Sequence, residues 1–493
     1  MVYTPEFMFG ILPAVLCLLA LLRRVRPDMI PLCLLLVSIA VFGAFHPYQS
    51  IVVLVMVAFN VMALGAIYRG VGPTGWVVAG AAVVHVGVLI AYKYYLTDQL
   101  PFGLSFVTFL NLSALLDARS RPALAQNPVQ NALYAAQFAT IAHGPITRFK
   151  DLQPQIAALK TKQVDAETLI TGLGLFVFGL AKAQLIGYPL HVIADDIATA
   201  AGNGATVLFL EVWIGAWAAL LSVYFQFSGY SDMAIACGMM VGLNLAPNFN
   251  SPLMAKSPSE FWNRWHMSLT TWIRVYLFMP VFKQIIGWFQ RGSRRGEITA
   301  WATATMVSMT IFGAWHGNAM AFVYWGAFAG FCLVVSQMPG ALGRSWQRHI
   351  GPRISQTLLF LVLAPPTYVF FAHDLATLGM LMSAMADPTT LSLPGRMAVF
   401  MPLGLLGTFV FDGLLPNVSG RTLDAFLYVL GGTLAALIAP NSMQIFGLLP
   451  RQKPAGLTWR LSPGWGLAVG VLLALCIPTI LSGVDTGFIY DGF

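Results

Sequence analysis

Long apolar segments recur from one end of the chain to the other, and they constrain the fold more than any other feature. They are about 15 to 21 residues long, and as helices most could cross the ~30 Å hydrocarbon layer of a bilayer. Only 9% of the 493 residues are charged, too few to cover the surfaces of soluble domains. The sequence therefore predicts an all-α polytopic membrane protein. The candidate spans are 8–22, 29–45, 50–67, 76–92, 169–189, 206–225, 299–315, 318–338, 355–372, 397–415, 423–439 and 464–482.

Basic residues indicate how these spans are oriented. Short loops rich in Lys and Arg stay on the cytoplasmic side of a membrane. The loop that carries Arg23 and Arg24 is therefore expected inside, with the N-terminus outside. Residues 191–204 carry Asp195 and Asp196 and no basic residue, so they are expected outside. The net charge of +8 comes largely from basic residues in the short loops that orient the protein, where they can also contact anionic membrane lipid. We therefore expect no nucleic-acid partner.

The regular pattern of spans breaks in two regions, at about 100–165 and 226–298, where shorter segments alternate with polar residues. Irregular or polar backbone at membrane depth persists only where it is buried in protein or lines a wet cavity. We therefore expect three parts. They are N-terminal transmembrane helices at 1–99, a functional core with re-entrant segments at 100–330, and C-terminal transmembrane helices at 331–493.

The stretch SPSEFWNRWHMSLTTWIRVY, residues 257–276, concentrates ionisable and aromatic side chains in an otherwise apolar chain. We expect one helix that runs to about Phe278, with Ser257 as its N-cap, Glu260 closing a capping box, and Glu260 pairing with Arg264. An interfacial helix would explain the tryptophans and arginines. It does not explain His266, which falls on the apolar stripe of that helix. His266 is therefore a candidate catalytic residue. The neighbouring candidates for substrate contact are Trp262, Asn263, Arg264, Ser268, Trp272 and Arg274.

A second histidine, His316, lies between two apolar runs in the stretch SMTIFGAWHGNAMAFVYWG. An ionisable side chain in that setting is costly to bury and indicates a functional site, whereas a hydrogen bond at a helix junction is the structural alternative. Gly313 and Gly317 favour function, because they allow close backbone approach to the imidazole or to a substrate. A histidine can accept the proton of a hydroxyl as that oxygen attacks an activated carbonyl. Acyl transfer with His316 as the base is the predicted chemistry, and the flanking candidates are Trp315 and Asn318.

Two further candidates lie in the segment before this region. Asp232 is a carboxylate within an apolar run, and Tyr224 precedes it on the same segment. Both suit the wall of a polar cavity, although hydrogen bonds between helices explain them nearly as well. The five cysteines show no CxxC spacing, so we expect neither a disulfide framework nor a metal site.

Several motifs together resemble the membrane-bound O-acyltransferase family, in particular its bacterial branch. That branch includes the alginate O-acetyltransferase membrane subunit and the teichoic-acid D-alanyl transfer protein. The resemblance is carried by EFWNRWHMSLTTWIRVYLFMP (260–280), GAWHG (313–317), LPFGLSFVTF (100–109), HGPITRFKDLQPQ (143–155), FQFSGYSDMAIACGMMVGLNLAPNFNSP (225–252) and LIAPNSMQIF (437–446). It covers residues 100 to 330 in detail and the remaining chain by topology.

The resemblance implies a fold of about 11 to 13 transmembrane helices, with re-entrant and interfacial pieces, around a central tunnel or funnel. It also implies that His316 is catalytic and that His266 matters on the cytoplasmic side of the path. One departure concerns Arg274, which is followed by Val275 and Tyr276, whereas the family commonly has Arg-Asp-Tyr. The carboxylate that would hold Arg274 is therefore missing.

The resemblance further implies transfer of an acyl group, with acetyl favoured, to a hydroxyl of a periplasmic or cell-surface polysaccharide or of a partner protein. The donor would be acetyl-CoA or an acyl-carrier phosphopantetheine thioester, and no bound cofactor is expected. A bacterial inner-membrane location and a periplasmic acyltransferase partner follow by analogy. D-alanyl transfer from a carrier protein is the alternative within the family. A transporter or channel is the alternative outside it, because polar groups in a helical membrane protein also serve transport.

Overall fold

The computed structural model describes residues 4–96, 100–290, 292–338, 345–372, 374–391, 415–418, 422–449 and 457–481. Every regular element in this part of the chain is a helix. Eight helical segments among these residues are long and apolar enough to cross a membrane. The prediction of an all-α multi-pass membrane protein is therefore confirmed. The expected total of 11 to 13 spans is larger, because it also counts helices that are shorter or more polar than these eight. Of the expected span at 397–415, residues 397–414 lie outside the described residues.

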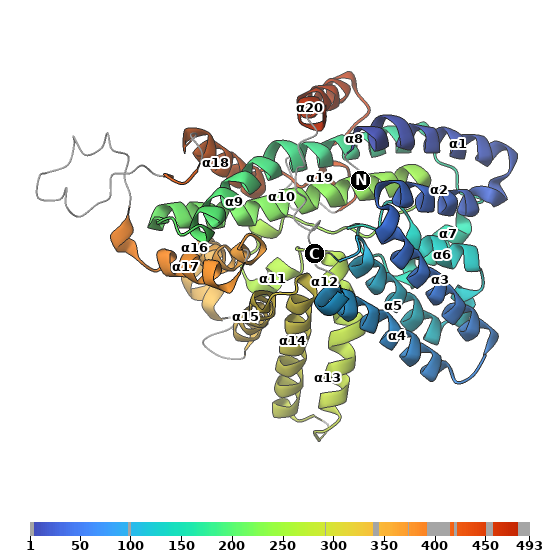
Figure 1. Ribbon diagram of the computed structural model, residues 1–493, viewed down its shortest axis with the longest axis horizontal. Helices are drawn as coiled ribbons and strands as arrows, with labels where there is room; N and C mark the ends of the chain where they lie inside the picture. Colours follow the sequence, from blue (N-terminus) through green and yellow to red (C-terminus); the bar gives the residue numbers. More distant parts are fainter. Residues whose placement is uncertain are drawn as a thin grey trace, which may run out of the picture.

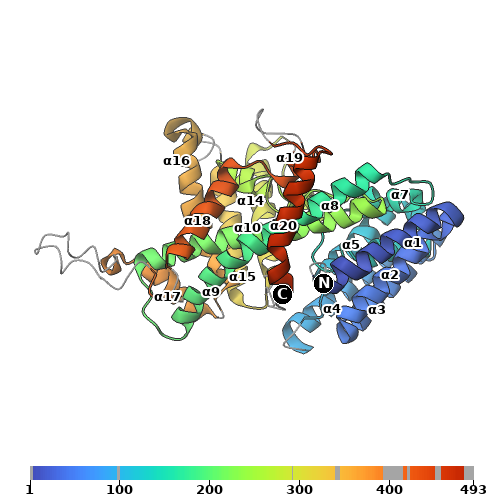
Figure 2. The same cartoon turned by 90° about the horizontal axis from the view of Figure 1, so that it is seen from above.

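The N-terminal helices form a bundle at one side of the molecule (Figure 2). Large apolar side chains such as Leu36, Ile51 and Val83 are exposed on its surface, as expected for contact with lipid tails. Two of its helices end or begin in a π-helical turn, at Glu6–Ile11 and Tyr92–Leu96. The helices are α1 (Leu12–Val25), α2 (Ile30–Phe45), α3 (Pro47–Arg69), α4 (Thr74–Ala91), α5 (Leu104–Ser120), α6 (Pro128–Ala136) and α7 (Phe149–Ala158).

Helix α5 contrasts with its neighbours, because most of its side chains are buried. Helices α3 and α4 pack against it, across the expected boundary at residue 99. The division of the chain at residues 99 and 330 stays a prediction.

A long helix, α10 (Phe209–Val241), runs along the long axis of the molecule in both views (Figures 1 and 2). Its 33 residues correspond to about 50 Å. α8 (Ala166–Ala181) and α9 (Tyr188–Gly202) pack along it, joined by a π-helical turn, Lys182–Gly187. The sequence predicts interruptions from residue 226 onwards, and here the structure differs, because α10 continues to residue 241. Its polar side chains are accommodated by buried partners on other segments.

The next elements lie below α10 in Figure 1 and include four short ones. A hairpin made by α13 and α14 projects from the rest of the molecule (Figure 1). The elements are α11 (Pro258–Trp262), α12 (Met267–Ile273), a π-helical turn (Arg274–Phe278), α13 (Met279–Ile286), α14 (Arg294–His316) and α15 (Met320–Gln337).

The C-terminal helices complete the enclosure of α10. Helices α17 and α18 pack on α9 and α10, whereas α20 packs on α8. The elements are α16 (Ser345–Leu363), a 3₁₀ helix (Pro365–Phe370), α17 (Leu375–Met385), α18 (Thr422–Ile438), α19 (Ser442–Ile445) and α20 (Pro463–Leu481).

Helices α14 and α15 are in backbone-to-backbone contact near the end of α14. A Cβ atom added to Gly313 would lie 2.7 Å from the Cα of Gly326 on α15 and would also collide with the Phe322 carbonyl oxygen. Only residues without a side chain allow this approach. The packing fixes the C-terminal turn of α14, which ends at His316.

Candidate active site

His316 is the last residue of α14, and its side chain is 2% exposed. Its Nδ1 lies 2.8 Å from the carbonyl oxygen of Phe312, one helical turn earlier. Because a carbonyl oxygen only accepts hydrogen bonds, Nδ1 must be the protonated nitrogen. In the neutral imidazole, Nε2 then carries the lone pair. His316 is therefore held in the tautomer that a general base requires.

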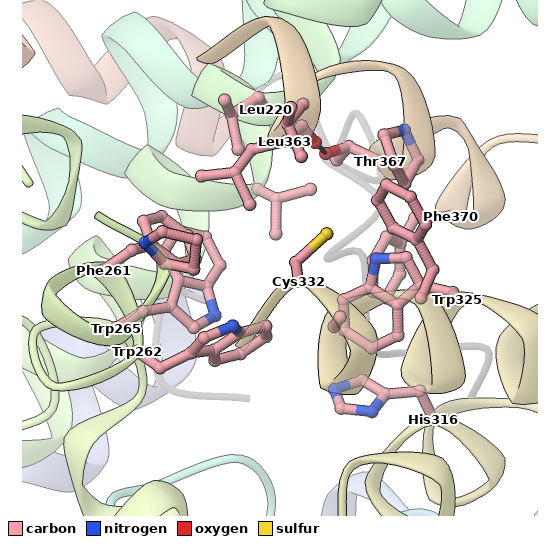
Figure 3. A pocket seen from close by; sticks show the side chains of 16 residues that line it. Leu220, Phe261, Trp262, Trp265, His316, Trp325, Cys332, Leu363, Thr367 and Phe370 are labelled. Carbon is pink, nitrogen blue, oxygen red and sulfur yellow. Dashed lines mark hydrogen bonds between the residues drawn. The ribbon is translucent and has the colours of Figure 1, made fainter. Parts of the chain in front are cut away.

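Aromatic rings enclose the His316 imidazole. Phe312, Trp315, Trp325 and Phe370 have ring centroids 4.3, 4.7, 5.1 and 5.8 Å away, and all four rings are roughly perpendicular to the imidazole. Figure 3 shows Trp325 and Phe370 above His316 along one wall of a cavity. The enclosure restricts the orientation of the imidazole and leaves little room for bulk water.

His266 lies at a break in the predicted helix. Helix α11 ends at Trp262, a turn follows, and α12 begins after His266. Ser257 is the N-cap, as predicted, because its Oγ accepts a hydrogen bond from the Glu260 backbone amide at 3.2 Å. The expected single helix to residue 278 is wrong, because His266 has a φ of 42° and a ψ of 51°. That left-handed conformation is uncommon outside glycine and cannot continue an α-helix.

The orientation of the His266 ring is set by Asn248, on the loop after α10. His266 Nδ1 lies 2.8 Å from Asn248 Oδ1, which also accepts hydrogen bonds from the Ser268 backbone amide at 3.4 Å and Ser268 Oγ at 2.9 Å. The amide nitrogen of Asn248 donates to Ser231 Oγ at 2.9 Å. A backbone amide can only donate, so this atom of Asn248 is the oxygen and His266 Nδ1 must carry a proton.

The Nε2 atom of His266 is buried and has no hydrogen-bond partner within the described part of the chain. The His266 side chain is 1% exposed, and the edge of Phe227 contacts its ring at a centroid distance of 4.6 Å. The two imidazoles of His266 and His316 are close enough to interact electrostatically. The site thus brings together two buried histidines, and in each of them Nδ1 is the nitrogen that donates a hydrogen bond.

A cavity of about 50 Å³ lies beside His316 and reaches the aromatic residues of α11 (Figure 3). A volume of this size holds a few water molecules or a small organic group. No lining residue carries an acidic or basic side chain apart from His316. The lining residues are Leu220, Val223, Pro258, Phe261, Trp262, Trp265, His316, Trp325, Phe328, Ala329, Cys332, Val362, Leu363, Pro366, Thr367 and Phe370.

Several predicted residues gather around the two histidines. Trp262 lines the cavity and contacts Phe312 and Trp325, which both contact His316. Tyr224 reaches Trp265, a further cavity residue, at a centroid distance of 6.3 Å. Ser268 is joined to His266 through the shared oxygen of Asn248.

Two predicted tryptophans, Trp272 and Trp315, contact the same phenylalanine, Phe109. Trp272 donates its indole N–H to the Phe109 carbonyl at 3.1 Å, and the Phe109 ring also contacts Trp315. The indole nitrogen of Trp315 is buried and has no hydrogen-bond partner among the described residues. It is a donor for which a bound substrate would supply the acceptor.

The remaining predicted residues do not reach the histidines. Arg264 is partly exposed and pairs with Glu260 at 2.6 Å, as predicted. Asn263, Arg274 and Asn318 are exposed. Asp232 lies in a separate buried cluster, where it accepts hydrogen bonds from Lys182 Nζ at 2.7 Å and from Ser442 Oγ at 2.5 Å. This cluster ties α10 to the turn after α8 and to α19.

Sequence reasoning missed two residues that the structure places beside the histidines. Asn248 lies in the APNFNSP motif, and only the fold reveals that it contacts His266. Lys93 follows the apolar run 76–92, and its ammonium group donates to the carbonyl oxygen of Trp315. A lysine at the end of a membrane span usually reaches for the aqueous interface, so the sequence gives no signal that Lys93 points inward.

The chain is similar in sequence to known proteins that transfer acyl groups. The probable alginate O-acetylase AlgI of Pseudomonas fluorescens is 31% identical over 316 residues, which cover 63% of this chain and 60% of that protein. The peptidoglycan O-acetyltransferase of Helicobacter pylori is 27% identical, covering 75% of this chain and 76% of that protein. The teichoic acid D-alanyltransferase of Bacillus subtilis is 26% identical, covering 53% of this chain and 68% of that protein.

The chain spans about half to three fifths of the length of the alginate relatives that it matches. A family model described as MBOAT, membrane-bound O-acyltransferase family, matches residues 91–347, more than half of the chain. The matched region contains the loop of Asn248, both histidines and Lys93. The chain therefore belongs to the membrane-bound O-acyltransferase family.

Proposed function

We propose that the protein transfers an acetyl group from a cytoplasmic thioester donor to a hydroxyl of a periplasmic or cell-surface polysaccharide, or of a partner protein. The family and the names of the O-acetylating relatives support this reaction class. The observation that carries the proposal is the placement of His316, a buried imidazole that lines a cavity and whose Nδ1–H is held by the Phe312 carbonyl.

In the proposed reaction, Nε2 of His316 accepts the proton of the acceptor hydroxyl as its oxygen attacks the thioester carbonyl carbon. The new C–O bond forms, and the carbonyl π electrons move onto the carbonyl oxygen. When this intermediate collapses, the C–S bond breaks and the imidazolium returns its proton to the leaving thiolate. A positioned base of this kind contributes about 10²- to 10⁴-fold to the rate.

We assign His266 to the donor side of the path. Its unpartnered Nε2 is a hydrogen-bond acceptor in a buried position, and an unpaired buried polar atom costs free energy unless a ligand pairs with it. Trp262 and Trp272 supply aromatic surface close to it. Arg294 and Arg295, exposed at the start of α14, would contact donor phosphates through charge-assisted hydrogen bonds.

The cavity favours acetyl as the acyl group. Its volume of about 50 Å³ suits a group of a few heavy atoms, and its walls near His316 are aromatic and aliphatic, without a carboxylate. A D-alanyl group carries an ammonium, for which an acidic partner would be expected. D-alanyl transfer remains the second candidate, because aromatic rings such as Trp262 and Trp325 can also bind an ammonium group through cation–π contacts and a D-alanyltransferase is among the relatives.

We infer a location in the bacterial inner membrane, with the donor on the cytoplasmic face and the acceptor outside. Acetyl-CoA or a phosphopantetheine-bound acyl group would be the donor. A periplasmic acyltransferase partner would complete the transfer to the polysaccharide, by analogy with envelope-modifying systems.

The test is acyl turnover by the full chain in proteoliposomes that receive radiolabelled acetyl-CoA or D-alanyl carrier protein on the cytoplasmic face. We expect wild type to release or transfer acetyl, and a folded His316→Ala variant to lose about 10²- to 10⁴-fold in rate. If the protein turned over only the D-alanyl donor, the transferred group would be D-alanyl and not acetyl. Full activity of His316→Ala would overturn the assigned base, and movement of intact substrate without acyl turnover would indicate a transporter.

A further inference from the structure

Lys93 is buried at a position where lysines normally reach water. It lies on the π-helical turn that ends a membrane-spanning segment, Thr74–Leu96. Lysines near the ends of such segments usually extend toward the aqueous interface. Lys93 is only 8% exposed, whereas Tyr95 and Leu96 in the same turn are 82% and 60% exposed. The side chain therefore points into the protein although the surface is within one turn of the chain.

The ammonium group of Lys93 lies beside His316. It donates a hydrogen bond to the backbone carbonyl of Trp315, the residue immediately before His316. The side chains of Lys93 and His316 are close enough to interact electrostatically. An ammonium group has three N–H donors, and the Trp315 carbonyl is the hydrogen-bond partner within the described residues, so two N–H groups remain for another acceptor.

A second lysine, which is partly buried, shows how the fold neutralises such a charge elsewhere. Lys182 forms an ion pair with Asp232 at 2.7 Å and also donates to Ser442 Oγ at 3.1 Å. No ion pair within the described part of the chain involves Lys93. A buried charge without a counter-ion is costly, so a negative charge that develops beside Lys93 during the reaction would be stabilised.

The structural alternative is that Lys93 only caps the C-terminal end of α14. A cation near a helix C-terminus is favourable. However, Tyr94 on the same turn donates its hydroxyl to the Ala314 carbonyl at 3.3 Å. A neutral donor thus caps the adjacent carbonyl, and capping alone does not require a charge. Substitutions of Lys93 and Tyr94 can therefore be compared, because both residues cap α14 and only Lys93 carries a charge.

We propose that Lys93 stabilises the negative charge that forms on the acyl carbonyl oxygen during transfer at His316. This role rests on the proposed acyltransferase function. As the acceptor oxygen bonds to the carbonyl carbon, the carbonyl π electrons move onto the oxygen and the hydroxyl proton passes to His316 Nε2. The free N–H groups of Lys93 then donate to the oxyanion. Collapse restores the carbonyl, breaks the C–S bond and returns the proton from His316 to the thiolate.

The experiment compares wild type with Lys93→Met, Lys93→Arg and Tyr94→Phe in proteoliposomes, with radiolabelled acetyl-CoA as the probe. Lys93→Met keeps an unbranched side chain, shorter by one heavy atom, and removes the charge. We expect kcat to fall about 10²- to 10³-fold, the usual loss of an oxyanion donor, with KM little changed. Lys93→Arg keeps the charge and should recover much of the lost rate. Tyr94→Phe removes a cap without a charge and should retain wild-type kcat.

The outcomes separate this role from a structural one and from the proposed function itself. An equal loss of kcat in Tyr94→Phe, or a Lys93→Arg variant as slow as Lys93→Met, would reduce Lys93 to a helix cap and overturn the inference. Full kcat in Lys93→Met would also overturn it while leaving the acyltransferase intact. Absence of turnover by wild type would instead contradict the function on which the inference depends. Thermal unfolding of each detergent-solubilised variant establishes that the compared proteins are folded.

Discussion

His266 and His316 are both buried with Nδ1 as a donor, yet the protein holds them in different ways. His316 ends a long helix, its Nδ1 bonds to a carbonyl of that helix, and aromatic rings surround it. His266 lies in a turn with left-handed backbone, and a side-chain amide from a distant loop orients it. The orientation of His316 therefore depends on packing, and that of His266 depends on a polar network.

This difference has consequences for mutation. A network built from Asn248, Ser231 and Ser268 fails when one partner is removed, because the remaining polar atoms stay buried and unpaired. An enclosure of aromatic rings is redundant, since each ring supplies only part of the contact. We therefore expect the polar surroundings of His266 to be sensitive to a single atom, and the surroundings of His316 to be sensitive to the spacing of α14 and α15.

The largest expected effect concerns the two histidines together. Asparagine tolerates left-handed backbone and can donate its amide to Asn248, so His266→Asn should fold like wild type but lose a large part of the rate. His316→Gln should lose more. Because the two imidazoles interact, we expect the double variant to be about as slow as the slower single variant. The measurement is single-turnover acyl transfer; multiplicative losses would show that the histidines serve separate steps.

An intermediate effect is expected at Asn248. Asn248→Ala removes the acceptor of His266 Nδ1–H and should lower kcat about 5- to 150-fold, corresponding to about 1–3 kcal/mol for a lost buried partner. Asn248→Asp keeps an acceptor oxygen and should recover part of that rate. Comparing kcat and KM for both variants tests this, and Ser231→Ala, which keeps the contact between Asn248 and His266, should show a smaller loss. Equal rates for Asn248→Ala and Asn248→Asp would contradict a role in orienting His266.

The smallest effect is expected from the helix contact that positions His316. In Gly326→Ala, the new Cβ would lie 2.7 Å from Gly313 Cα and would collide with the Met309 carbonyl oxygen. Overpacking of this kind costs about 1–3 kcal/mol, so both the midpoint of thermal unfolding and the rate should decrease. Gly330→Ala on the same helix, with its nearest neighbour at 3.1 Å, is the milder control. Identical midpoints for the two variants would show that α14 and α15 can move apart to accept the new methyl group without loss of stability.

The helical spans could be predicted from the sequence because apolar length alone determines whether a segment can cross a membrane. The extent of α10 could not, since Ser231 and Asp232 look like interruptions until their partners Asn248 and Lys182 are known. His266 and His316 were identifiable as polar residues in apolar surroundings. Their tautomers, and the presence of Lys93 next to His316, depend on contacts between residues up to 222 positions apart, which no local pattern encodes.

The length of α10 determines how far each substrate has to travel. Its C-terminal end accepts a hydrogen bond from Arg23 at Val241, on the loop expected in the cytoplasm, and its first residue follows the stretch expected outside. Tyr224, near its midpoint, contacts Trp265 at the wall of the cavity. A helix of about 50 Å thus has the reacting group beside its middle, about 25 Å from either end. In the proposed reaction, donor and acceptor would therefore each reach a site about halfway along α10, from opposite sides of the membrane.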